Sequence, residues 1–282
     1  MFVANWKTYK TNVSEVNEFF KELPIYSASF KQGIEIVLCP STIHLEAVST
    51  MKPSNVILGA QDCSQYGSGP YTGETTAGQL STVGVKYCIV GHVYKRKYGE
   101  TDQMINNKIK QCLASGIAPI VCFGETLQEY DADQTRIILE RQMRDCLIGI
   151  KDLQNVILCY MPMWSIGTGF YTTGEYSNII ADFMRKTAVK LTGNPMSANC
   201  TILFGGQITS GNCKEYLETP EVDGVMFSIP ALKPKDFADV INVDFDIKKY
   251  LKVCHAPVSK EELQKASDGK LNADNDSSAN LG

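Results

Sequence analysis

The stretch that decides the fold is residues 160–169, which read Tyr-Met-Pro-Met-Trp-Ser-Ile-Gly-Thr-Gly. It follows residues 156–159, Val-Ile-Leu-Cys, an apolar run with the length and composition of a buried strand. Pro162 prevents regular strand pairing beyond that run, and Gly167 and Gly169 allow a backbone with positive φ. A strand that ends in a stiff hinge and continues into a glycine-containing loop is predicted to carry a lid.

Similar apolar runs alternate with helical patterns along the chain. The predicted strands are 2–6, 34–39, 56–61, 87–91, 117–123, 156–160, 201–204 and 224–227. Their near-continuous apolar character is typical of parallel strands that are covered on both faces. Between them, residues 16–23 repeat apolar side chains at helical spacing, and Asn12 with Glu15 forms a predicted capping box before them. The alternation predicts a (β/α)8 barrel or a doubly wound sheet, and periodicity leaves both open.

Composition excludes several classes of partner. The chain has 282 residues, 44% of them hydrophobic, and a formal net charge of −4, which gives no reason to expect nucleic acid or an anionic membrane surface. No apolar run approaches the roughly 20 residues that cross a membrane. Residues 1–7 lack the pattern of a signal peptide. We therefore expect a cytoplasmic protein.

The ten cysteines contain no Cys-x-x-Cys pair, and the histidines, at 44, 92 and 255, do not lie at metal-ligand spacing from a cysteine pair. We interpret the cysteines as small, buried, reduced side chains. Neither a metal site nor a cofactor is expected.

The last part of the chain differs from the rest. Residues 256–282 are rich in Ser, Lys, Glu, Asp, Asn and Gly and contain almost no large apolar side chains. Such a segment buries too little surface to offset its ordering entropy. The predicted organisation is one domain over residues 1–255, followed by a polar, disordered tail over 256–282.

The segment 160–169 resembles the lid of triosephosphate isomerases, which reads Tyr-Glu-Pro-Val-Trp-Ala-Ile-Gly-Thr-Gly. Other matches are Asn-Trp-Lys at 5–7, Gly-Ala-Gln at 59–61, Pro-Tyr-Thr-Gly-Glu at 70–74, Ile-Val-Gly-His at 89–92, Cys-Phe-Gly-Glu at 122–125, Gly-Gly at 205–206 and Asp-Gly-Val at 223–225. They fall at the carboxyl ends of predicted strands, where barrel enzymes place their sites. The resemblance implies a single-domain (β/α)8 TIM barrel, and not a doubly wound sheet.

The resemblance also implies roles for individual residues. Members of the family interconvert dihydroxyacetone phosphate and glyceraldehyde 3-phosphate in glycolysis, using a carboxylate base and a neutral His. This scheme is the established one for the family and is carried over here by likeness alone. Lys7 would steady the negative charge of the substrate, Asn5 and His92 would donate to its oxygen, and Gly167 would offer a lid N–H to the phosphate.

The departures from the family concentrate at the same site. The base position is Met161, which has no ionisable group. After His92 the family's Ser-Glu-Arg-Arg is Val-Tyr-Lys-Arg, so Tyr94 replaces the carboxylate that would support Lys7. In the family's Tyr-Gly-Gly-Ser, the first and last residues become Phe204 and Gln207. The lost base predicts a pseudoenzyme with isomerase turnover lost or severely impaired.

The phosphate-binding positions are altered as well. The family's Gly-Gly-Ala-Ser at the eighth strand becomes Ser-Ile-Pro-Ala, which places Ser228 and Ile229 where glycines would bring backbone N–H groups to the phosphate. Gln207 is bulkier than the small hydroxyl residue that the family uses there. We predict weakened phosphate binding at Gly167, Gln207, Ser228 and Ile229.

Two alternatives to a simple loss of activity stay open. Another carboxylate, such as Glu125 or Asp62, would make the protein an active isomerase of a different sugar phosphate. Alternatively, the chain is a non-catalytic binding protein or the dimer partner of an active subunit. In the family, the loop at residues 65–76 inserts into a neighbouring subunit, which implies a homodimer here, with a sugar phosphate as the possible ligand.

Overall fold

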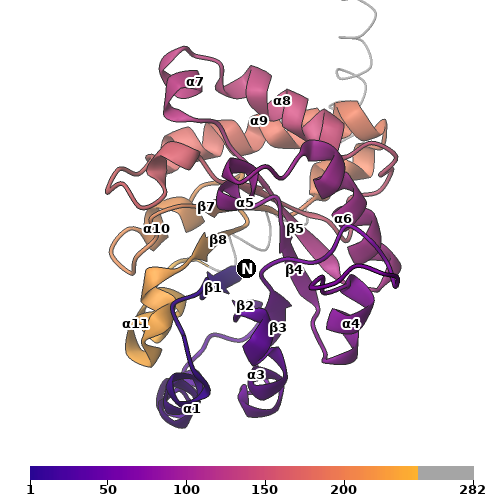
Figure 1. Cartoon of the computed structure of the whole chain (residues 1–282). Helices are drawn as coiled ribbons and strands as arrows, with labels where there is room; N and C mark the ends of the chain where they lie inside the picture. The colour runs from indigo at the N-terminus through magenta and orange to yellow at the C-terminus, as the bar shows by residue number, and fades with distance from the viewer. Residues whose placement is uncertain (247–282) are drawn as a thin grey trace, which may run out of the picture.

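The structure is a computed structural model that describes residues 1–246. Its eight strands pair in parallel and in chain order, and β8 pairs back with β1 to close a barrel (Figure 1). The strands are β1 Phe2–Asn5, β2 Ile36–Cys39, β3 Ile57–Ala60, β4 Tyr87–Val90, β5 Ala118–Phe123, β6 Ile157–Tyr160, β7 Ile202–Gly205 and β8 Gly224–Phe227. All eight predicted strands are confirmed, and the (β/α)8 TIM barrel is the fold. The doubly wound alternative is wrong.

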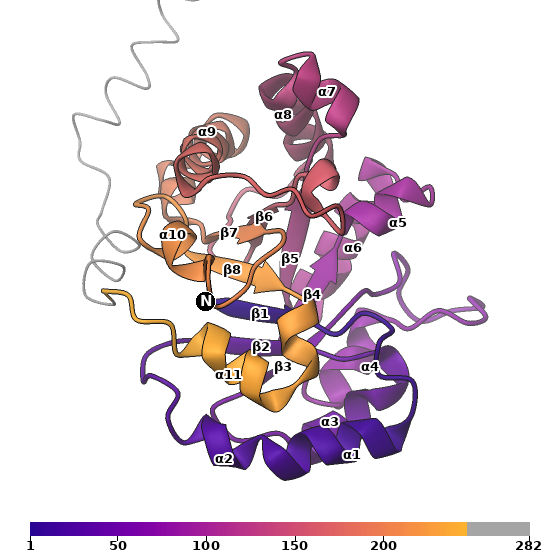
Figure 2. The same ribbon diagram turned by 90° about the vertical axis from the view of Figure 1, so that its left-hand side faces the viewer.

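The helices form the outer layer, with α1, α2, α3 and α11 along one side of the barrel and α7, α8 and α9 along the opposite side (Figure 2). Their bounds are α1 Val13–Glu22, α2 Pro24–Ser27, α3 Leu45–Met51, α4 Ala77–Thr82, α5 Val93–Lys97, α6 Asp102–Ala114, α7 Leu127–Asp131, α8 Thr135–Cys146, α9 Gly174–Thr192, α10 Cys213–Leu217 and α11 Pro234–Ile241. The predicted capping box of Asn12 and Glu15 is confirmed at the start of α1.

The strands alternate between two apolar cores, as period-two geometry requires. In β1, Phe2 and Ala4 face the layer between barrel and helices, whereas Val3 faces the barrel interior. In β6 the inward residues are Ile157 and Cys159, and Met161 continues this inward set one residue beyond the strand. The strand face therefore decides which side chains can reach a site at the mouth of the barrel.

The described residues contain no helix long and apolar enough to span a membrane. The predicted polar tail, 256–282, and the last predicted barrel residues, 247–255, lie outside the described part of the chain.

Candidate active site

A pocket of about 310 Å³ opens at the carboxyl ends of the strands. All eight residues that the sequence predicts for the site line it: Asn5, Lys7, His92, Met161, Gly167, Gln207, Ser228 and Ile229. Tyr9, Tyr94 and Thr209 also line the pocket. Sequence reasoning gave Tyr9 and Thr209 no role, since neither stands in a matched motif. The predicted residues thus meet in one place, while their roles stay predictions.

Lys7 is held in a strained backbone conformation at the end of β1. Its φ of 49° lies in the left-handed region that a non-glycine residue rarely adopts. Its N–H donates to Asn5 Oδ1 at 2.9 Å, and its carbonyl accepts from Ser41 Oγ and Gln61 Nε2, each at 2.8 Å. Residues just beyond the ends of β2 and β3 therefore hold this backbone. Burial lowers the pKa of the Lys7 ammonium.

His92 stands at the N-terminus of α5. Its Nδ1 accepts a hydrogen bond from the Tyr94 N–H at 3.2 Å, so a neutral ring carries its proton on Nε2. Burial, and then the positive charge of Lys7, lowers the pKa of His92 to about 4. The ring is therefore neutral at physiological pH, and its role as a donor to substrate stays a prediction.

Tyr94 lies close to Lys7, His92 and Gly167 in this pocket. The Lys7 Nζ lies over its ring, 5.0 Å from the centroid, in a cation–π contact. Its ring centroid lies 5.4 Å from that of His92, and a Cβ added to Gly167 would lie 3.4 Å from its hydroxyl. Tyr94 thus replaces the family's carboxylate with a π face, which attracts the ammonium without carrying a negative charge.

Met161 is buried at the end of β6, with 2% of its surface exposed. Its N–H donates to the Phe123 carbonyl at 2.7 Å, and its side chain belongs to the apolar cluster of the barrel interior, together with Val93. A Cβ added to Gly205 would lie 2.7 Å from the Met161 methyl. Met161 and Val93 stand where the family has Glu and Ser, and both now lie in the apolar interior of the barrel. Met161 cannot accept a proton there at any pH.

Neither alternative carboxylate lines the pocket. Glu125 is fully buried and accepts hydrogen bonds from Tyr160 Oη and Trp164 Nε1, each at 3.0 Å. The other carboxylate oxygen of Glu125 is buried without a hydrogen-bond partner. Burial raises the pKa of Glu125. Asp62 pairs with Lys95 at 2.9 Å and Lys108 at 2.6 Å. Among residues 1–246, the pocket lining contains no aspartate or glutamate.

The side of the pocket made by β7 and β8 carries the altered positions Ser228 and Ile229. Ile229 begins a short 3₁₀ segment, Ile229–Leu232, with 60% of its surface exposed. The Ser228 hydroxyl is buried without a hydrogen-bond partner, although the residue lines the pocket. Phe204 faces away from the pocket and stacks on Tyr216, with centroids 4.4 Å apart. The ring therefore keeps a packing role after the loss of the family's hydroxyl.

The closed barrel and a pocket at the strand ends define a (β/α)8 barrel protein with an enzyme-like site. The family model described as triosephosphate isomerase matches residues 1–244. A triosephosphate isomerase of Carboxydothermus hydrogenoformans is 37% identical over 245 residues, which cover 85% of this chain and 97% of that protein. One of Bacteroides fragilis is 34% identical over 242 residues (85% and 96%), and one of Clostridium novyi 34% over 248 (86% and 98%). The chain belongs to the triosephosphate isomerase family.

Proposed function

We propose that this protein is a member of the family that binds a sugar phosphate or a similar small anion but has lost, or nearly lost, isomerase turnover. The single observation that carries the proposal is Met161 in a pocket lining without a carboxylate. The family reaction needs a base that removes a proton from carbon, and such a base contributes ~10²–10⁴-fold to the rate. No other side chain of the described lining is an acidic group that could take over this step.

Ligand binding depends on a different set of residues. Lys7 is the only Lys or Arg among the described residues of the lining, and Asn5 and His92 supply neutral donors beside it. A cation with neutral donors, and without competing carboxylates, favours an anionic ligand with oxygen acceptors. These residues support binding in the absence of catalysis. The altered positions Gln207, Ser228 and Ile229 support an affinity below that of active relatives.

A coupled isomerase assay tests this function. The protein is purified from a host that lacks its own isomerase, and an active relative is purified in the same way as the positive control. We expect kcat to be at least ~10²-fold below that of the relative. Calorimetry with dihydroxyacetone phosphate should detect binding that Lys7→Met weakens. A kcat within tenfold of the relative would overturn the loss of turnover, and the absence of anion binding would overturn the binding role.

We also propose that the protein is a homodimer through the loop 65–76. This loop projects from the barrel between β3 and α4 (Figure 2). The Tyr66 and Tyr71 rings stack with centroids 4.1 Å apart and an interplanar angle of 6°, and both are exposed. A preformed loop of this kind can insert into a partner at a low entropic cost. The partner is an identical chain or, as a second possibility, an active isomerase chain.

Light scattering over a range of protein concentrations tests the assembly. A homodimer should have twice the chain mass of 31.1 kDa. Tyr71→Asp should shift it toward the monomer, whereas Tyr98→Asp, at another exposed tyrosine, should not. A species that stays monomeric at high micromolar concentration contradicts the homodimer. If mixing with an active relative also gives no mixed species, the second possibility fails too.

A further inference from the structure

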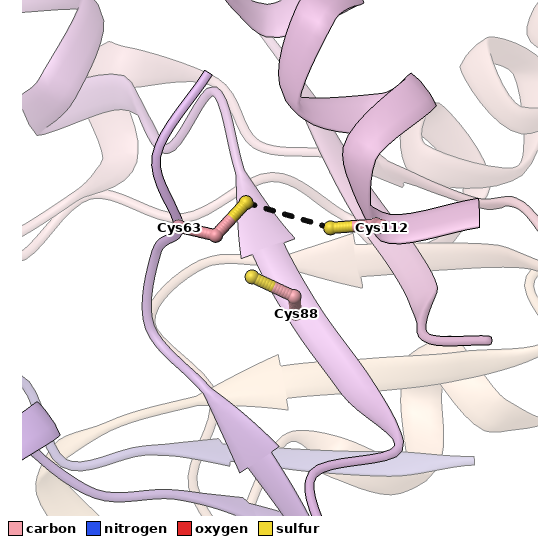
Figure 3. Close-up of side chains that lie close together, drawn as sticks. All are labelled: Cys63, Cys88 and Cys112. Atoms are coloured by element: carbon pink, nitrogen blue, oxygen red, sulfur yellow. Dashed lines mark hydrogen bonds between the residues drawn. The ribbon is translucent and has the colours of Figure 1, made fainter. Parts of the chain in front are cut away.

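Three cysteines that are far apart in the sequence meet on the side of the barrel next to α6. Cys63 follows β3, Cys88 lies in β4 and Cys112 lies in α6. Their sulfur atoms all lie within 4.8 Å of one another, and the Cys63 and Cys112 sulfurs are 3.5 Å apart. Figure 3 shows the three side chains pointing toward one another from these elements. None of the three lines the candidate active site.

The fold itself brings the three thiols together. Ala60 of β3 is in register with Cys88 of β4, so the chain that leaves β3 passes beside Cys88. All three cysteines belong to the apolar layer between barrel and helices, which includes Ile109 on the same helix as Cys112. Cys63 is 4% exposed, and Cys88 and Cys112 are fully buried. A sequence spacing rule could not find this group, because each cysteine comes from a separate element.

The geometry of the three sulfurs fits a single metal ion. Thiolate–metal bonds are about 2.3 Å long, so three sulfurs arranged in a triangle around one ion would lie about 4 Å apart. The three sulfur–sulfur distances are all within 4.8 Å, so binding an ion requires only small side-chain adjustments. The type of ion then follows from the donor set.

The donor set consists of sulfur alone. Within the described residues, the group contains no histidine, aspartate, glutamate or fourth cysteine within the same distance. Structural zinc sites take four ligands in a tetrahedron. Hard ions such as Mg²⁺ and Ca²⁺ require oxygen. Thiolates without nitrogen or oxygen donors select a soft ion. Among the metals that thiolates bind, Cu(I) is the soft monovalent ion.

Each of the three thiols that becomes a ligand would release its proton to solvent when the ion binds.

We propose that Cys63, Cys88 and Cys112 form a binding site for one soft monovalent metal ion, Cu(I), outside the active-site pocket. The ion would join the start of the loop 65–76 to α6 through β4. This proposal does not depend on the proposed function, because it concerns none of the pocket residues.

Titration of the reduced, metal-free full chain with Cu(I), in competition with a colorimetric Cu(I) chelator, tests the site. We expect one equivalent per chain to be taken from the chelator. Cys63→Ser, Cys88→Ser and Cys112→Ser should each weaken this binding at least tenfold. Cys213→Ser, at a buried cysteine outside the group, should leave it unchanged. X-ray absorption on the one-equivalent complex should give three sulfur neighbours.

A second measurement guards against variants that fail to fold. The wild type and Cys213→Ser should both gain thermal stability on addition of one equivalent of Cu(I). Cys63→Ser, at the least buried of the three, should melt near the wild-type apo temperature and gain nothing. Absence of Cu(I) uptake by the wild type overturns the proposal, as does uptake that none of the three variants weakens. Preference for Zn(II) over Cu(I) in the same competition overturns the identity of the ion.

Discussion

The two sides of the pocket differ in how closely their residues follow the family. On the β1–β4 side, Asn5, Lys7 and His92 keep the residue types of the family. On the β6–β8 side, Met161 and Ile229 depart from it. The first group is tied to the backbone: Asn5 accepts from the Lys7 N–H, and His92 accepts from the N-terminus of α5. Ile229, in contrast, is 60% exposed.

The difference teaches that retained site residues are not by themselves a sign of catalysis. Asn5 and His92 satisfy backbone N–H groups, so their loss would cost stability whether or not the protein turns over substrate. Met161 fills an apolar interior, where a carboxylate would be costly to bury. Folding therefore favours the residues of the first side and permits those of the second. The predictions below test this contrast, from the largest expected effect to the smallest.

The largest effect is expected for Met161→Glu. If the β1–β4 side is still competent, the restored base should raise kcat by ~10²-fold or more, although not to the level of active relatives. The new carboxylate would lie among Val93 and Ile166, so its pKa should be raised and the activity should increase with pH. Coupled assays across pH measure both effects. Met161→Gln, of similar shape but without a base, is the matched control and should gain nothing.

Two outcomes of the Met161→Glu experiment would change the comparison. Absence of any gain would mean that the altered β6–β8 side, and not the missing base, limits turnover. Full activity with a normal KM would show that Gln207, Ser228 and Ile229 do not impair phosphate binding.

The second prediction uses the pKa of His92, which is about 4 in the folded protein against 6.5 for a free side chain. Between these values the unfolded chain binds a proton that the folded chain does not. The stability that the neutral His92 contributes is therefore fully present above pH 6.5, and it is lost as the pH drops toward 4. At pH 5 the loss should be about 2 kcal/mol.

Urea unfolding at pH 7.5 and pH 5.0 measures this loss. His92→Gln keeps an acceptor for the Tyr94 N–H but cannot titrate, so its stability should fall less between the two pH values than that of the wild type. Because the other ionisable groups are common to both proteins, the difference isolates His92. Equal losses in both proteins would contradict the lowered pKa.

The continuous apolar runs predicted the strands, and the family resemblance, not periodicity, selected the closed barrel over the doubly wound sheet. Motifs at the strand ends predicted the residues that meet in the pocket, while the roles of those residues stay predictions. Strand ends were less accurate: residues 56–61 were predicted, and β3 is Ile57–Ala60. Contacts between distant elements were not predictable. The cation–π contact of Lys7 with Tyr94 depends on the register of the barrel, and so does the meeting of Cys63 with Cys112. A positive φ at a lysine has no sequence signal.

The third prediction concerns that strained backbone. At a φ of 49°, Lys7→Gly should be more stable than Lys7→Ala by about 1 kcal/mol, because glycine adopts this region without a Cβ clash. Both variants lose the ammonium and should bind dihydroxyacetone phosphate equally weakly. Denaturant unfolding and calorimetry separate the two effects. Equal stability of the two variants would show that the β1 end is not strained.

The smallest effect on stability is expected for Ile229→Gly. Since this side chain is 60% exposed, its removal should cost about 1 kcal/mol or less, mainly through the backbone entropy that glycine adds to the unfolded chain. Ile43, 78% exposed in the 3₁₀ segment Thr42–His44, is a matched isoleucine outside the pocket lining, and Ile43→Gly should be equally mild.

The two substitutions should differ in ligand binding. In a Met161→Glu background, Ile229→Gly should lower KM several-fold, because a missing Cβ lets backbone N–H groups approach the phosphate. Ile43→Gly should leave KM unchanged. If Ile229→Gly destabilises the protein strongly, Ile229 contributes to folding despite its exposure, and the contrast between the two sides fails. If KM does not move, the phosphate is held elsewhere in the pocket, and Lys7 becomes the main determinant of anion binding.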